Sequence, residues 1–144
     1  MGKILIFCLF ISASVFSQKL NDSTAIVKLL INDYKTLGNW DIKSHINNCT
    51  NNYLLIEDGE IWDMKKEAEY YIKNANRKMD RKDYFDIKYV RVYGEYGYAV
   101  YNLKSDITEY GKLVTRKWIE SAIFRKINGE WKIELLNSTP IGNK

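Results

Sequence analysis

The chain has 144 residues, enough for one domain and too few for two, and its 46% hydrophobic and 28% charged residues are ordinary for a soluble globular protein. A formal net charge of +4 without clustered Lys and Arg argues against a nucleic-acid-binding surface. One Pro and 8 Gly argue against long disordered linkers, and the 14% aromatic residues, 11 Tyr among them, favour β structure.

The N-terminal segment, residues 1–17, has the composition of a cleavable signal peptide. Lys3 is a positive n-region, residues 4–11 are apolar, and the following residues become small and polar. This apolar run is too short to span a bilayer. We predict cleavage before Gln18 and export of residues 18–144 as one domain, periplasmic or extracellular, with no membrane attachment after signal removal. The alternative is a buried N-terminal helix.

Helical periodicity follows this segment. Asp22 and Ser23 are expected to cap a first helix, whose apolar residues recur as far as Leu37 and which should end near Gly38. Asp41 is expected to cap a short second helix.

Strand signals begin after the second helix. Residues 53–57 predict a strand, and Asp58-Gly59 predicts a tight turn into a short second strand. Asp63 is expected to cap a third helix that reaches Ala75. From there the period changes to two, which predicts four long strands at 84–93, 98–110, 113–127 and 130–139.

These elements predict an α+β fold, with three N-terminal helices and a short hairpin packed on a curved antiparallel sheet that forms a cone with a pocket. If Gly111-Lys112 and Asn128-Gly129 are two-residue turns, both registers place the same set of residues on one face. A β-bulge near Lys88 or Tyr89 would bring the first long strand into the same register. The predicted inner face comprises Ala99, Tyr101, Leu103, Ser105, Ile107, Arg116, Trp118, Glu120, Ala122, Phe124, Ile133, Leu135, Asn137 and Thr139.

The predicted inner face is apolar at one end and polar at the other. Arg116 and Glu120 lie two pleat repeats apart, roughly 13 Å, so they cannot pair directly and each needs another partner, water or a ligand. The alternative is a structural network in which Glu120 bonds to Asn137 and Arg116 lies in solvent at the rim. The outer face carries the apolar residues Val100, Ile119, Ile123 and Leu136. Together they would form a patch for a homodimer through the outer sheet face.

Cysteine and histidine are scarce in the predicted mature chain. Cys49 is its only cysteine, so no internal disulfide can form, and we interpret it as a buried thiol. His45, the only histidine, lies four residues earlier and can touch it, but we see nothing nearby that would complete a catalytic triad. One His and one Cys offer no ligand cluster, so we predict no metal site and no cofactor.

Three motifs resemble the nuclear transport factor 2-like superfamily, with the SnoaL-like domains, many of them secreted and uncharacterised, as the most similar branch. They are residues 39–41 (NWD), 57–62 (EDGEIW) and 116–133, within a resemblance that covers about residues 22–140. The resemblance implies a conical pocket and often dimerisation through the sheet. It is compatible with isomerases, dehydratases, cyclases and non-catalytic binders. Members of this branch often carry His in the last strand where Asn137 stands here, and Asn cannot shuttle a proton near neutral pH.

Two functions remain open from the sequence. The first is an exported small-molecule-binding or interaction domain with an aromatic-lined pocket, no defined catalysis and a small organic ligand. The second is a small-molecule enzyme of the ketosteroid isomerase, cyclase or dehydratase type, with Glu120 as base and Tyr101 or Tyr53 as hydrogen-bond donor. The candidate binding residues are Tyr34, Trp40, Tyr53, Trp62, Tyr71, Tyr101, Arg116, Trp118, Glu120 and Asn137.

Overall fold

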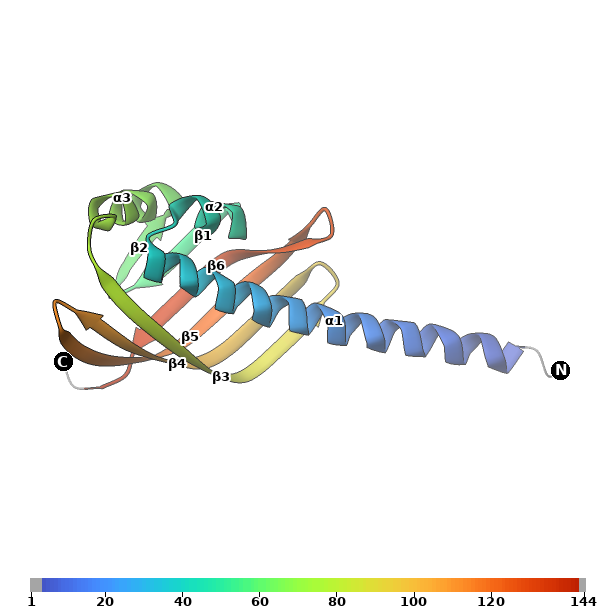
Figure 1. Ribbon diagram of the computed structural model, residues 1–144. Coiled ribbons are helices and arrows are strands. Elements are labelled where there is room, and N and C mark those ends of the chain that lie inside the picture. The colour runs from blue at the N-terminus through green and yellow to red at the C-terminus, as the bar shows by residue number, and fades with distance from the viewer. Residues whose placement is uncertain (1–3, 143–144) are drawn as a thin grey trace.

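The computed structural model describes residues 4–142, with side chains from Asn21 onward. Its elements are α1 (Ile4–Asn39), α2 (Ile42–Asn48), β1 (Cys49–Glu57), β2 (Glu60–Asp63), α3 (Met64–Asn74), β3 (Met79–Tyr93), β4 (Tyr96–Glu109), β5 (Lys112–Ile127) and β6 (Glu130–Pro140). The strands form one curved, unclosed sheet in the order β2-β1-β6-β5-β4-β3, in which only the β1–β6 pair is parallel. Helix α1 runs across the sheet, and α2 and α3 lie beside β1 and β2 (Figure 1). The predicted α+β cone is confirmed.

Helix α1 begins at Ile4 rather than at Asp22, so the predicted N-cap was wrong. No Gly or Pro interrupts the sequence between residues 3 and 37, and the helix therefore continues through the predicted leader. The Asp22 carboxylate instead accepts hydrogen bonds from Lys126 Nζ (2.6 Å) and Trp131 Nε1 (3.0 Å). Residues 1–17 lie outside the described side chains, and the leader stays a prediction. In the described part of the chain, no helix is both long and apolar enough to cross a membrane.

Most local signals of the sequence are confirmed. The Asp41 side chain caps α2 and the Asp63 side chain caps α3, each accepting a backbone N–H of the first turn. Asp58-Gly59 and Asn128-Gly129 adopt positive φ at both positions, as two-residue hairpin turns require. Because these turns are tight, they fix the register of β1 with β2 and of β5 with β6 next to the turn.

The β4–β5 hairpin turns at Tyr110-Gly111, one residue earlier than predicted. Both residues have positive φ (50° and 77°), and a turn of this kind favours Gly at its second position. Tyr101 therefore pairs with Glu120 instead of Ala122, a register shift of two residues. Since side chains alternate with a period of two, every residue of the two strands keeps its predicted face.

The β5–β6 register changes part-way along the strands. The predicted pairing holds as far as Phe124, but beyond it Glu134 is an extra residue in β6, which makes a β-bulge. A one-residue shift exchanges the two faces of a strand. Leu136 and Ser138 are therefore buried on the inner side, and the predictions of Leu135, Asn137 and Thr139 inside and of Leu136 outside were wrong.

Helix α1 packs closely on the inner face of the sheet. The predicted bulge in β3 is present at Lys88, and it brings Val92 to the inner face. At Gly97 a Cβ atom would lie 2.8 Å from Ile26 Cδ1 and 3.0 Å from the Arg91 carbonyl oxygen, so the close approach of α1 requires glycine there. The core around this contact includes Ile26, Leu30, Tyr34, Ala99, Tyr101, Leu103, Ala122, Phe124 and Ile133.

Candidate functional site

A cavity of about 530 Å³ lies between the helices and the inner face of the sheet, within the usual size range of small-molecule sites. Its aromatic residues are Tyr34, Trp40, Tyr53, Trp62, Tyr70, Tyr71 and Trp118. Its acidic residues are Asp33, Glu57, Asp58, Glu60, Glu67, Glu109 and Glu120, and its basic residues are His45, Arg77, Arg81 and Arg116. The cavity is thus bordered by aromatic rings and by more acidic than basic groups.

Eight of the candidate residues from the sequence border this cavity, namely Tyr34, Trp40, Tyr53, Trp62, Tyr71, Arg116, Trp118 and Glu120. Tyr101 does not border it, because its side chain is fully buried in the core. Asn137 does not border it either, because the bulge at Glu134 turns Ser138 inward in its place. Arg116 is exposed, in keeping with a position at the rim.

Glu120 is a buried carboxylate, with 2% of its surface exposed. The Tyr34 hydroxyl donates a hydrogen bond to Glu120 Oε2, and Ser138 Oγ donates one of 2.8 Å to Oε1. Burial raises the pKa of Glu120, and the hydrogen bonds from Tyr34 and Ser138 oppose this rise in part. The hydrogen bond predicted from Asn137 is therefore made by Ser138, with Tyr34 of α1 as a second donor.

Glu57 is a cavity residue that the sequence reasoning missed. Ser138 pairs with Glu57 of β1 on one side and with Glu120 of β5 on the other, so the three residues form one row across the sheet. Burial, together with repulsion from the nearby carboxylates of Asp58, Glu120 and Glu67, raises the pKa of Glu57 to about 7. No described residue gives the Glu57 carboxylate a hydrogen bond or an ion pair. The row could have been found only with the β1–β6 register in hand.

Arg81 is a basic group inside the cavity whose charge is paired with Asp83. Its Nε lies 2.9 Å from Asp83 Oδ1, and its Nη2 donates to Ser105 Oγ at 3.0 Å. The guanidinium carbon lies 5.6 Å from the Tyr34 ring centroid and 5.9 Å from that of Trp118, within cation–π range. The side chain is only 8% exposed, so it serves as part of the wall.

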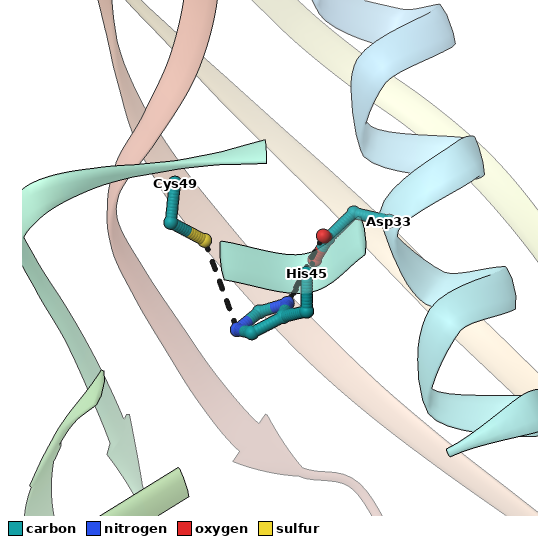
Figure 2. Close-up of side chains that lie close together, drawn as sticks. All are labelled: Asp33, His45 and Cys49. Atoms are coloured by element: carbon teal, nitrogen blue, oxygen red, sulfur yellow. Dashed lines mark hydrogen bonds and ion pairs between the residues drawn. The ribbon is translucent and has the colours of Figure 1, made fainter. Parts of the chain in front are cut away.

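A second cluster, Asp33, His45 and Cys49, joins α1, α2 and the start of β1 (Figure 2). His45 Nδ1 lies 3.0 Å from Asp33 Oδ1, and His45 Nε2 lies 3.7 Å from Cys49 Sγ. Glu67 Oε2 of α3 lies 3.4 Å from the same Nε2. The predicted His45–Cys49 contact is present, but the expectation that nothing nearby would complete a triad was wrong, because Asp33 supplies the third group.

The cluster has the order of a Cys-His-Asp triad without the reactivity of one. Burial raises the pKa of the Cys49 thiol to about 11, although His45 pulls it down. Cys49 is also not among the described residues that border the cavity, so a bound molecule would meet the imidazole before the sulfur. The thiol is therefore a poor nucleophile for anything in the cavity.

The same cluster holds His45 as a buried cation. Burial alone would lower the pKa of the imidazole, but hydrogen bonds with Asp33, Cys49 and Glu67 outweigh it and raise the pKa well above its usual range. Ligand atoms of Asp33, His45 and Cys49 lie within 4.8 Å of one another, yet Asp33 and Cys49 contact different ring nitrogens (Figure 2). Because one ion would be bound by only one nitrogen of the ring, we interpret His45, with Asp33 on one side and Glu67 on the other, as an ionic clamp between the three helices.

The arrangement defines a class of protein, an α+β cone with an aromatic, acid-lined cavity. No family model and no curated protein matches the sequence. The association domain of CaMKII from C. elegans is similar in structure, with a TM-score of 0.75 and 16% identity over 85% of this chain and 98% of that chain.

Two bacterial structures are similar as well. A ketosteroid isomerase-like protein from Erwinia carotovora atroseptica gives a TM-score of 0.68 with 17% identity over 83% of this chain and 96% of that chain. An NTF2-like protein from Cytophaga hutchinsonii gives 0.67 with 14% identity over 82% and 97%. The chain has the NTF2-like fold, and at these identities the likeness extends to the fold alone.

The ionic clamp predicts a pH dependence of stability. From about pH 6.5, the ordinary pKa of histidine, the unfolded chain releases a proton that native His45 retains, so stability should fall as the pH rises. We expect the free energy of unfolding to fall by about 1 kcal/mol more between pH 7 and pH 8 in the native sequence than in His45→Gln. Urea unfolding at both pH values measures this. Glu57, with its pKa of about 7, contributes equally to both proteins and cancels.

A direct readout covers the case in which His45→Gln does not fold. The chain has a single histidine, so the imidazole nitrogen signals of the untagged protein are unambiguous. We expect the ring to remain an imidazolium at pH 8. A neutral ring at that pH would contradict the clamp.

Proposed function

We propose that the protein is an exported domain, periplasmic or extracellular, that binds a small organic molecule in the cavity without defined catalysis. The observation that carries the proposal is an open cavity of about 530 Å³ beside the buried carboxylate of Glu120 and the half-buried carboxylate of Glu57. An unfilled cavity and a buried charge each destabilise a fold. A ligand that fills the cavity and pairs with the charge offsets these two costs. Export is proposed from the composition of residues 1–17.

The walls of the cavity support an organic ligand. Trp40, Trp62 and Trp118 border it, and indole rings offer large apolar surfaces with cation–π capacity. Tyr70 makes edge-to-face contacts with Trp40 and with Trp62, at centroid distances of 5.8 and 5.6 Å. The aromatic wall is therefore held in place without a ligand.

This function predicts a retained molecule. The full chain, expressed in a bacterial host that can process the leader and recovered from outside the cytoplasm, should have the mass of residues 18–144 and, under native conditions, carry an adduct of a few hundred daltons. Trp118→Ala should lose most of the adduct because it opens the wall, whereas Tyr110→Ala, an exposed turn residue outside the cavity, should keep it. Native mass spectrometry measures both masses. An unliganded spectrum from every preparation would count against the proposal.

A second candidate function is proton transfer of the ketosteroid isomerase type with Glu120 as base. The observation that favours it is the raised pKa of this buried carboxyl group, which brings it closer to neutral pH. Tyr34 rather than Tyr101 would be the hydrogen-bond donor, because only Tyr34 of the two borders the cavity. Against it, both Glu120 oxygens are already engaged by Tyr34 and Ser138.

The two functions predict different effects of Glu120→Gln on turnover. If the protein transfers protons, the native sequence should isomerise a β,γ-unsaturated ketone, which is measured by the absorbance of the conjugated product. The rate in Glu120→Gln should then be lower by about 100-fold or more. The binding function predicts no turnover above buffer in either protein. Measurable isomerisation that Glu120→Gln abolishes would replace the first proposal with the second.

We also propose that the protein forms a homodimer through the outer face of the sheet. Ile119 and Ile123 are 51% and 42% exposed on this face, and Tyr98 pairs directly with Ile123. Several proteins of similar structure are named as association or hub domains of CaMKII, and such domains are compatible with oligomer formation. Together these residues form an apolar surface next to which a second copy would exclude water.

This interface predicts a mass change in one variant and not in its control. Ile123→Glu should convert the dimer to a monomer at micromolar concentration, because it places two charges in a symmetric apolar contact. Ile72→Glu, on α3 at 67% exposure, is the matched control and should leave the mass unchanged. Analytical ultracentrifugation decides the point, and a monomer in the native sequence overturns it.

A further inference from the structure

The acidic groups of the cavity are paired unevenly. Arg77 pairs with Glu109, and the imidazolium of His45 lies between Asp33 and Glu67. Glu60 pairs with Lys66. This leaves three acidic residues that line the cavity without an ion pair to a described residue, namely Glu57, Asp58 and Glu120.

Two of these unpaired carboxylates stand on either side of one hydroxyl group. Ser138 is the strand partner of both Glu57 and Glu120, and neighbouring strands lie about 4.8 Å apart, so the two glutamate backbones are separated by about 10 Å. A glutamate side chain reaches several ångströms into the cavity from each side. Both carboxylates border the same cavity on either side of Ser138, so one ammonium group bound over Ser138 would face both.

We propose that the ligand is an organic cation, whose ammonium group lies between Glu57 and Glu120 and whose apolar body packs on Trp118. This inference rests on the proposed binding function and names the chemical class of the ligand. Both carboxylates and the indole border the same cavity, and Trp118 lies two residues from Glu120 on the same face of β5.

The rim of the cavity shows the same recognition within the protein itself. Lys66 Nζ lies 2.6 Å from Glu60 Oε2 and 4.6 Å from the ring centroid of Trp62. Glu60 and Trp62 both border the cavity, so an ammonium group already rests there between a carboxylate and an indole. Deeper in, Glu120 and Trp118 also border the cavity together, and the cation next to them is Arg81, which lies 5.9 Å from the Trp118 ring centroid and is ion-paired with Asp83.

An anionic ligand is the competing class, and the pairing pattern disfavours it. Arg81 is a basic group on the aromatic wall, but its charge is already paired with Asp83 at 2.9 Å. Arg116 is exposed at the rim. An anion that entered far enough to reach Arg81 would approach Glu57 and Glu120, and like charges in a cavity repel strongly.

Three compounds with one skeleton separate the classes: 3-phenylpropylamine, 3-phenylpropan-1-ol and 3-phenylpropanoate. At pH 8, where Glu57 is ionised, the amine should bind at least about tenfold more tightly than the alcohol, and the acid more weakly than both. Glu57→Gln and Glu120→Gln should each bring the amine-to-alcohol ratio towards one while leaving alcohol binding unchanged. Glu130→Gln, 75% exposed and outside the cavity, is the control and should keep the ratio. Titration with detection of the Trp118 indole signal locates the binding and gives each affinity.

The outcomes separate this inference from the function on which it rests. Equal or tighter binding of the alcohol or the acid overturns the cation and keeps the binding function. A retained molecule without a positively charged nitrogen does the same. If none of the three compounds shifts the Trp118 signal and native mass spectrometry finds the cavity empty, the inference and the binding function both fall.

Discussion

Charge placed beside a cavity has to be paired, and this constraint organises the inside of the molecule. His45 illustrates the fully paired case, with Asp33 on one ring nitrogen and Glu67 and Cys49 at the other. Arg81 is largely paired as well, through Asp83 and Ser105. Removing an ion from water costs several kcal/mol unless a partner replaces the lost hydration. We therefore interpret these two paired groups as structural. The groups that remain unpaired are the ones that point to a ligand.

Much of the fold could be predicted because local chemistry determines it. Asp41 and Asp63 cap helices through contacts within one turn, and the hairpin at Asn128-Gly129 depends only on residues able to take positive φ. The β4–β5 turn lies at Tyr110-Gly111, one residue earlier than predicted. The predicted faces were still correct, because the resulting register error of two residues leaves every side chain of both strands on the same face. Parity made the inner face of β4 and β5 predictable even with the wrong register.

The residues that decide the site could not be read in the same way. The bulge at Glu134 depends on how β6 bends between antiparallel β5 and parallel β1, and no turn chemistry encodes it, so Asn137 was expected where Ser138 lies. Asp33 left a usable signal, because it interrupts an apolar helical stripe that runs from Leu30 to Leu37 and is buried there. A buried acid on such a stripe requires a partner, and the only histidine of the chain is the natural one.

The charge of the cavity lining is opposite in sign to the net charge of the whole chain. The protein carries a net charge of +4, yet the residues around the cavity include seven carboxylates against three arginines and one histidine. Solvation alone would place acidic residues on the outer surface, where their charges stay hydrated and do not lower the stability of the fold. In this half-dry space burial and the neighbouring carboxylates raise the pKa of Glu57 to about 7, and the repulsion weakens the empty protein. A cation that enters this space would relieve the repulsion among the carboxylates and gain attraction strengthened by the low polarity of the aromatic walls.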